Sequence, residues 1–164
     1  MRFLTAVCLL FATLASFAQN QPVPSPPVIG ATSYLMIDAK SGAELASLKP
    51  DTPVPPASLT KLMTTYVVFQ ALAEGRIGLD DEVTISEKAW RMQGSRMFIE
   101  VGTRVRVEDL LLGVIVQSGN DASVALAEYV AGSESVFVEL MNRTAQTLGM
   151  LSSHFTNATG WPDP

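Results

Sequence analysis

The pattern of apolar positions begins with two short runs that predict a β-hairpin. Residues 34–37 (Tyr-Leu-Met-Ile) and residues 44–48 (Glu-Leu-Ala-Ser-Leu) lie on either side of a Lys-Ser-Gly turn at 40–42. Two short runs joined by a Gly-containing turn are typical of antiparallel strands. A two-stranded hairpin is only marginally stable in water, so further strands or a helix should cover it.

The next apolar block predicts a helix with a defined start and end. Residues 62–72 are mostly apolar and closely follow Pro55-Pro56. Proline is accepted before a helix or in its first turn but not inside it, so Ser58 should lie in the first helical turn. The helix should run to about Glu74, where Gly75 supplies the usual C-terminal stop.

The second half of the chain is expected to be mostly helical. The strongly apolar block at 110–116 predicts a buried helix, and the polar stretch 117–120 ends it. Two more helices are expected at 121–130 and 133–149. The remaining expectations are extended pieces at 83–85, 97–99 and 104–106, a short helical turn capped by Ser86, and a polar loop at 154–160.

The first residues resemble a secretory signal peptide and not part of a fold. Arg2 precedes an apolar run at 3–14, and the small residues Ser16 and Ala18 stand at the −3 and −1 positions of a cleavage site. An uncleaved anchor is the alternative, but the run is short for a membrane span. The predicted organisation is therefore a signal peptide at 1–18, a Pro- and Gln-rich linker at 19–32, and one domain from residue 33 to residue 164.

Charge and cysteine content narrow the class of protein further. The formal net charge is −5, and the sequence contains no cluster of basic residues. Both features argue against nucleic acid as a partner. The single cysteine, Cys8, lies inside the predicted signal peptide, so the mature chain would form no disulfide. An exported chain without cysteine fits a bacterial envelope protein better than a disulfide-rich eukaryotic one.

Ser58-Leu59-Thr60-Lys61 is the first candidate for chemistry. Residues three apart on a helix share a face, so Lys61 can reach the Ser58 hydroxyl. The helix start also provides unpaired N–H groups and the positive end of the dipole, which favour an alkoxide at Ser58 and a neutral amine at Lys61. A neutral lysine can act as a general base. Taken alone, the spacing is a weak signal, and a capping serine with a solvated lysine is the default interpretation of these residues.

Ser118-Gly119-Asn120 is the second candidate, in the predicted loop between two helices. A serine hydroxyl can relay a proton, and an asparagine amide can both donate to and accept from a peptide. Ordinary turn and capping chemistry accounts for the same residues when they are considered alone.

Together these motifs resemble a known family. Ser-x-x-Lys followed by Ser-x-Asn and then Lys-Thr-Gly is the signature of penicillin-binding proteins and related β-lactamases. The first two occur here in that order. Flanking segments at 56–64, 94–99, 117–122 and 137–164 resemble the low-molecular-mass D-alanyl-D-alanine carboxypeptidases, and the resemblance extends from about residue 29 to residue 164.

The resemblance implies a fold, a substrate and a role for each site residue. The fold would be α/β, of the penicillin-binding-protein and serine β-lactamase type. Ser58 would be the acyl-ester nucleophile, Lys61 its general base, Ser118 the proton relay and Asn120 a substrate-binding residue. The partners would be peptidoglycan stem peptides ending in D-Ala-D-Ala and β-lactam inhibitors. No cofactor and no metal would be needed.

One element of the signature is missing from the chain. Neither Lys-Thr-Gly nor its Lys-Ser-Gly and His-Thr-Gly variants occur, and in the family this element lies well after Ser-x-Asn. We therefore expect the 164 residues to be the N-terminal part of a longer carboxypeptidase, whose later strands and any C-terminal membrane anchor would follow Pro164. The alternatives are an inactive fragment or a non-catalytic envelope protein and, within the enzyme class, an endopeptidase or a β-lactamase.

The signal-peptide interpretation predicts where the mature protein begins. Cleavage after Ala18 should give Gln19 as the first residue of protein isolated from the cell envelope. N-terminal sequencing of that fraction checks this expectation. Envelope protein that still begins at Met1 would show that the leader is not removed.

Overall fold

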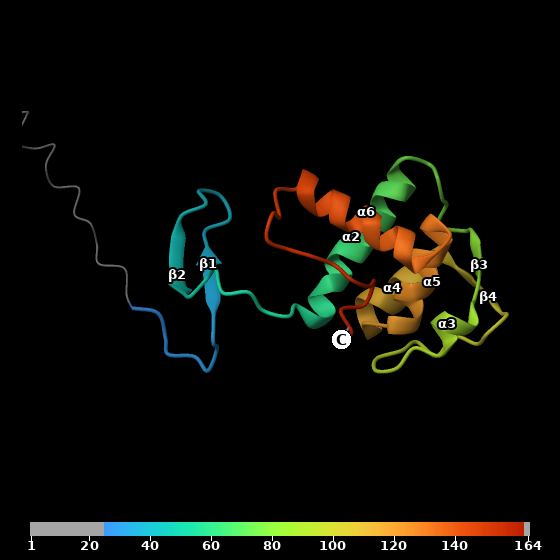
Figure 1. Cartoon of the computed structure of the whole chain (residues 1–164), viewed down its shortest axis with the longest axis horizontal. Helices are drawn as coiled ribbons and strands as arrows, with labels where there is room; N and C mark the ends of the chain where they lie inside the picture. Colours follow the sequence, from blue (N-terminus) through green and yellow to red (C-terminus); the bar gives the residue numbers. More distant parts are fainter. Residues whose placement is uncertain (1–24, 163–164) are drawn as a thin grey trace, which may run out of the picture. The chain divides into compact units, whose positions relative to one another are not determined.

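The computed structural model describes residues 25–162 (Figure 1). The predicted signal peptide at 1–18 lies outside the described residues, as does the linker before residue 25. Residues 25–32 carry no helix or strand. The chain divides into two compact units, one ending at Pro53 and one beginning at Val54.

The first unit contains the predicted hairpin. Strand β1 (Tyr34–Ile37) pairs antiparallel with β2 (Glu44–Leu48), with Tyr34 opposite Leu48. In the turn, the Asp38 carboxylate accepts hydrogen bonds from the backbone N–H and the hydroxyl of Ser41, both at 2.7 Å, and these bonds lower the pKa of Asp38. The hairpin prediction is therefore confirmed.

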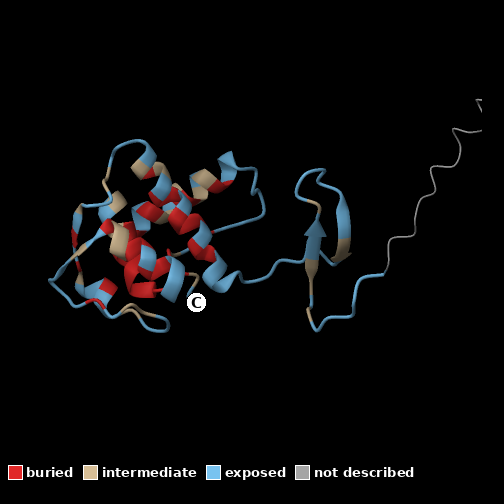
Figure 2. Cartoon of the chain, turned by 180° about the vertical axis from the view of Figure 1, so that it is seen from behind, coloured by how far each residue is buried: buried red, intermediate tan, exposed pale blue. Residues whose placement is uncertain are grey.

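The second unit is a bundle of helices around α5. Most of the first two turns of α5 are buried, and α5 packs against α2, α3, α4 and α6. The residues coloured as buried in Figure 2 concentrate on these helices. The predicted helices are thus present, with these bounds: α2 (Thr60–Ala73), α4 (Val107–Gln117), α5 (Asn120–Ala131) and α6 (Glu134–Thr147).

A small sheet and a short helix complete the second unit. Strand β3 (Glu82–Thr84) pairs antiparallel with β4 (Arg104–Arg106). Helix α3 (Glu87–Trp90) follows β3, and the hydroxyl of Ser86 caps it by accepting from the Ala89 N–H at 3.0 Å. The predicted cap at Ser86 is therefore confirmed.

The expected strand at 97–99 is wrong. The three residues form a loop, and Phe98 has a left-handed φ of 64°. Their backbone N–H groups donate to the carboxylate of Asp121 instead of to a neighbouring strand. A side chain far along the sequence has therefore taken the hydrogen bonds that a strand would need.

The expectation that the 110–116 helix is buried holds for one face only. Leu110, Leu111 and Val114 are buried, whereas Leu112, Ile115 and Val116 on the same helix are exposed. The first set packs on α5 and the second does not contribute to the core. Within residues 25–162, no helix combines the length and apolar character needed to span a bilayer.

Two neighbouring residues of α6 test where the core lies. Phe137 is 0% exposed and Val136 is 43% exposed. Phe137→Ala should lower the free energy of unfolding by about 3–5 kcal/mol, because it removes a large buried side chain and leaves a cavity. Val136→Ala should change it by less than about 1 kcal/mol. Urea denaturation of both variants measures this, and equal effects would contradict the assigned core.

Candidate active site

Ser58 stands at the entrance to α2. It lies in the short 3₁₀ turn η1 (Ala57–Leu59), so the α-helix begins at Thr60, slightly later than the sequence predicts. Ala57 adopts a left-handed φ of 47°, which a residue with a side chain rarely adopts. The Ser58 side chain is exposed, and its backbone N–H has no acceptor among the described residues. Both groups are therefore available to a ligand.

Lys61 lies one turn further on and is buried, with 5% of its surface exposed. Its Nζ donates to Ser58 Oγ at 3.3 Å and to the Thr159 carbonyl oxygen at 3.0 Å. Among the described residues, no carboxylate pairs with it. Removal from water without a counter-charge disfavours the ammonium, and this burial lowers the pKa of Lys61.

The Thr159 carbonyl oxygen also determines the orientation of a neutral Lys61 amine. A carbonyl oxygen only accepts hydrogen bonds, so Nζ must direct one of its hydrogens toward it. In the neutral amine, the lone pair is then available to accept the Ser58 hydroxyl proton at the same Nζ–Oγ distance. The geometry therefore suits proton transfer from Ser58 to Lys61.

The loop that carries this carbonyl is held by its own asparagine. Asn157 Oδ1 accepts from the N–H of Thr159 at 3.1 Å, the hydroxyl of Thr159 at 3.0 Å and the N–H of Gly160 at 2.7 Å. The Thr64 hydroxyl, on α2, donates to the Ala158 carbonyl oxygen at 2.7 Å. These bonds fix the Thr159 carbonyl against the helix that carries Lys61.

Gly160 shows how closely the loop approaches the Ser58 turn. Its φ is +75°, and a Cβ added there would lie 1.8 Å from the Ala57 carbonyl oxygen. Only a residue without a side chain can occupy this position.

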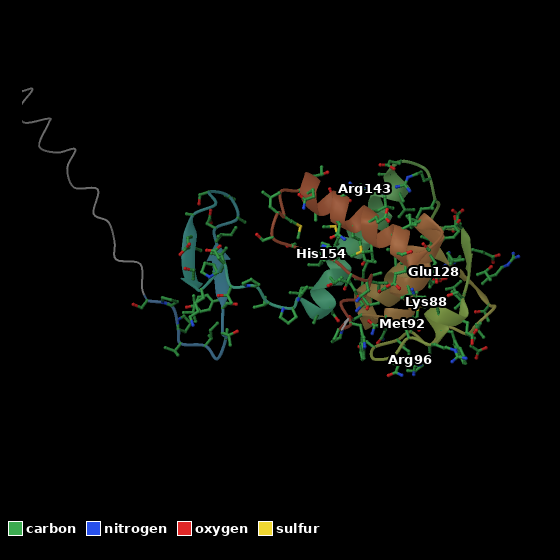
Figure 3. The ribbon with its side chains drawn as sticks, viewed as in Figure 1. Lys88, Met92, Arg96, Glu128, Arg143 and His154 are labelled. Atoms are coloured by element: carbon green, nitrogen blue, oxygen red, sulfur yellow. The ribbon has the colours of Figure 1, made fainter. Side chains whose placement is uncertain are left out.

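A buried carboxylate fastens the same loop to α6. Glu134 Oε1 accepts from the Ala158 N–H at 2.9 Å, and Glu134 Oε2 pairs with Lys88 Nζ of α3 at 2.6 Å. Figure 3 labels Lys88, together with the exposed His154 that begins the loop. The loop is therefore bonded to α2 and α6, and Glu134 is itself paired with α3.

The second motif lies at the junction of α4 and α5. Ser118 ends α4 in a left-handed conformation with φ 54°, and Asn120 is the first residue of α5. The Asn120 side chain is buried, and its Nδ2 donates to the Gln93 carbonyl oxygen at 2.6 Å. Its backbone N–H donates to the Ser95 carbonyl oxygen at 2.8 Å. One N–H and the oxygen of the amide remain for a ligand.

Trp161 and Gly94 bring the loops beside the two motifs close to each other. A Cβ placed on Gly94 would lie 2.9 Å from Asn120 Nδ2 and 2.6 Å from Cζ3 of the Trp161 ring. Trp161 directly follows Gly160, which touches the Ser58 turn. The loop beside the Ser58 turn and the loop beside Asn120 therefore meet where the Trp161 ring approaches Gly94, although no hydrogen bond joins Ser58 or Lys61 to Ser118 or Asn120 within the described residues.

Another serine of the described part of the chain, Ser86, has a structural role. Ser86 donates to Glu128 Oε2 at 2.6 Å while capping α3, so its hydroxyl is already used structurally. Residues of β3 and α5 line a surface pocket of about 490 Å³ that contains none of the four candidate residues. No cluster of three or more potential metal ligands occurs in residues 25–162.

The sequence did not reveal several residues that shape the site. The Thr159 contact uses a main-chain carbonyl, which has no side-chain signature. Asn157 could have been recognised, because Asn-x-Thr-Gly is a sequence suited to an Asx turn. Glu134 and Asp121 lie at the starts of predicted helices, where carboxylates are common and give no sign of a further role.

Comparison with known proteins gives consistent matches. The family model described as D-alanyl-D-alanine carboxypeptidase matches residues 20–164. The chain is 46% identical over 165 residues to the D-alanyl-D-alanine carboxypeptidase DacA of Haemophilus influenzae, covering 99% of this chain and 42% of that protein. It is 45% identical to DacC of Escherichia coli, covering 98% of this chain and 41% of that protein.

A solved structure has the same arrangement of elements. Penicillin binding protein 5 from Haemophilus influenzae superimposes with a TM-score of 0.82 and 49% identity, over 86% of this chain and 42% of that one. The fold is therefore part of the penicillin-binding-protein fold, and the α/β prediction is confirmed. The chain spans about two fifths of the length of these relatives. It belongs to the D-alanyl-D-alanine carboxypeptidase family.

Proposed function

We propose that the full-length protein is a serine-type D-Ala-D-Ala carboxypeptidase that trims peptidoglycan stem peptides. The observation that carries the proposal is the contact of the buried Lys61 amine, which forms no ion pair with the described residues, with Ser58 Oγ at 3.3 Å. A serine beside a lysine that burial pushes toward neutrality is an activated nucleophile. Membership of the family supplies the substrate class.

In the first step, Ser58 Oγ attacks the carbonyl carbon of the D-Ala–D-Ala bond while Lys61 Nζ accepts the hydroxyl proton. The developing oxyanion accepts from the backbone N–H of Ser58, which has no acceptor among the described residues. One such donor stabilises the transition state by about 3 kcal/mol.

The attack gives a tetrahedral intermediate. Its collapse breaks the C–N bond and leaves an acyl-enzyme on Ser58. Ser118 relays a proton to the departing D-Ala amine, and water then hydrolyses the ester to regenerate Ser58. Asn120 holds a backbone amide of the substrate through the amide atoms that Gln93 leaves available. The leaving-group role of Ser118 is supported by its position beside Asn120, in a loop held by two helices.

The proposed place of action is the bacterial periplasm or cell envelope. Peptidoglycan, the proposed substrate, lies outside the cytoplasmic membrane, and the predicted leader at 1–18 accounts for export of the protein. Membrane association through a later C-terminal segment and a contribution to cell shape are part of the same proposal.

A non-catalytic envelope protein is the alternative from another class. The presence of Lys61 in a buried position next to Ser58 favours the enzyme, because a buried amine without a counter-charge is costly to keep for structure alone. Translating the gene beyond Pro164 and finding Lys-Thr-Gly on a predicted strand would distinguish the two.

Covalent labelling tests the nucleophile directly. In the full-length protein, labelled penicillin should attach to Ser58, because the β-lactam bond resembles the scissile D-Ala–D-Ala bond. Ser58→Ala should abolish labelling and also D-Ala release from a peptide ending in D-Ala-D-Ala. Lys61→Ala should slow labelling by about 10²–10⁴-fold, the usual contribution of a general base. Mass spectrometry of the labelled peptide checks the position.

The matched control is Ser86→Ala, which removes another serine hydroxyl that lies beside a charged side chain. Its labelling rate should equal that of the unmutated protein. Label that persists in Ser58→Ala would move the active site elsewhere. Cleavage of a cross-linked peptide in preference to release of terminal D-Ala would identify an endopeptidase, and rapid turnover of penicillin would identify a β-lactamase.

A further inference from the structure

Asp121 makes an unusual set of contacts directly after Asn120. The carboxylate is buried, with 1% of its surface exposed, and it forms no ion pair with any described residue. All of its partners are backbone N–H groups. They belong to Met97 at 3.1 Å, Phe98 at 2.9 Å, Ile99 at 3.4 Å and Ala122 at 2.9 Å.

These contacts hold the 93–99 loop in a conformation that the loop would not adopt alone. A carboxylate offers two oxygens that only accept, so it can bind several consecutive N–H groups together. Phe98 has a left-handed φ of 64°, which is unfavourable for an aromatic residue. The Arg96 guanidinium lies 4.8 Å from the centre of the Phe98 ring and is labelled on this loop in Figure 3. Asp121 therefore offsets the strain in Phe98.

The other part of the same loop holds Asn120. The Gln93 carbonyl oxygen accepts from Asn120 Nδ2 at 2.6 Å, and the Ser95 carbonyl oxygen accepts from the Asn120 N–H at 2.8 Å. Two consecutive residues of α5 thus bind one loop. The Asp121 carboxylate accepts from N–H groups of the loop, and Asn120 donates to carbonyl oxygens of the loop. The orientation of the Asn120 amide depends on where the Gln93 carbonyl lies, and hence on the loop.

We propose that Asp121 is a positioning residue, which orients the Asn120 amide toward a substrate amide by fixing the 93–99 loop. The inference rests on the proposed function for its chemical meaning. It also predicts a selective effect. Ligands that carry an acylamino group, such as benzylpenicillin or an acylated D-Ala-D-Ala peptide, depend on Asp121. A β-lactam without that group, 6-aminopenicillanic acid, does not.

Hydrogen exchange tests the structural half of the proposal in the full-length protein without using activity. Asp121→Asn keeps the size of the side chain but turns one oxygen into a donor, which faces N–H groups that are donors too. Exchange at the Met97, Phe98 and Ile99 amides should become about tenfold faster or more. The side-chain amide resonances of Asn120 should shift.

The control for this experiment is Val124→Ala, a buried position on the same helix whose side chain makes no hydrogen bond. In Val124→Ala, the amides of the 93–99 loop should exchange as in the unmutated protein, apart from any change shared by the whole domain. Unchanged loop exchange and unchanged Asn120 resonances in Asp121→Asn would overturn the proposal, whether or not the protein binds penicillin.

A double-mutant cycle tests the functional half. Asp121→Asn should slow acylation by benzylpenicillin about tenfold or more and leave acylation by 6-aminopenicillanic acid nearly unchanged. In an Asn120→Ala background, Asp121→Asn should add no further loss. Equal losses in both backgrounds, or equal losses for both β-lactams, would show a merely structural role. Lack of labelling in the unmutated protein would instead contradict the proposed function, and hydrogen exchange would still decide whether Asp121 fixes Asn120.

Discussion

The burial of one lysine amine beside a serine hydroxyl is the constraint on which the candidate site depends. Lys61 has 5% of its surface exposed, and its contacts are neutral oxygens of Ser58 and Thr159. An ammonium in such a place has little contact with water and no counter-charge among the described residues, so the neutral amine is favoured. A lysine without function would more easily have kept its charge in solvent.

This arrangement has a consequence for stability. Because the pKa of Lys61 is lower in the folded state than in the unfolded state, the unfolded chain binds a proton more readily. Stability should therefore rise with pH through the window between the folded pKa and 10.5, and below that window the protonated lysine opposes folding. Burial of Lys61 therefore lowers the stability of the fold at pH values below 10.5.

Two loops supply the rigidity that the site requires. The loop after α6 carries the Thr159 carbonyl and is fixed by Asn157 and by Glu134. The loop after α3 surrounds Asn120 and is fixed by Asp121. In both cases side-chain oxygens accept hydrogen bonds from backbone N–H groups of an irregular segment, which fixes the position of that segment.

The sequence predicted most of the regular elements and pointed to the candidate site residues, because both have local signatures. Hairpin turns, helix caps and the three-residue spacing of Ser58 and Lys61 depend on neighbouring residues. The strand expected at 97–99 was wrong, because the N–H groups of this segment donate to the carboxylate of Asp121, more than twenty positions away in the sequence. The Thr159 carbonyl could not be predicted, since a main-chain contact leaves no trace in the residue type. The exposed face of α4 likewise depends on which elements pack against it.

The protonation of Lys61 is the most direct test of the central claim. An NMR titration of the full-length protein, with lysine labelled and Lys61 assigned by comparison with Lys61→Arg, measures the pKa of its Nζ. The account predicts a value below the ordinary 10.5. A pKa of Lys61 at or above 10.5 would show that the amine remains charged, and Lys61 would not be the base that activates Ser58.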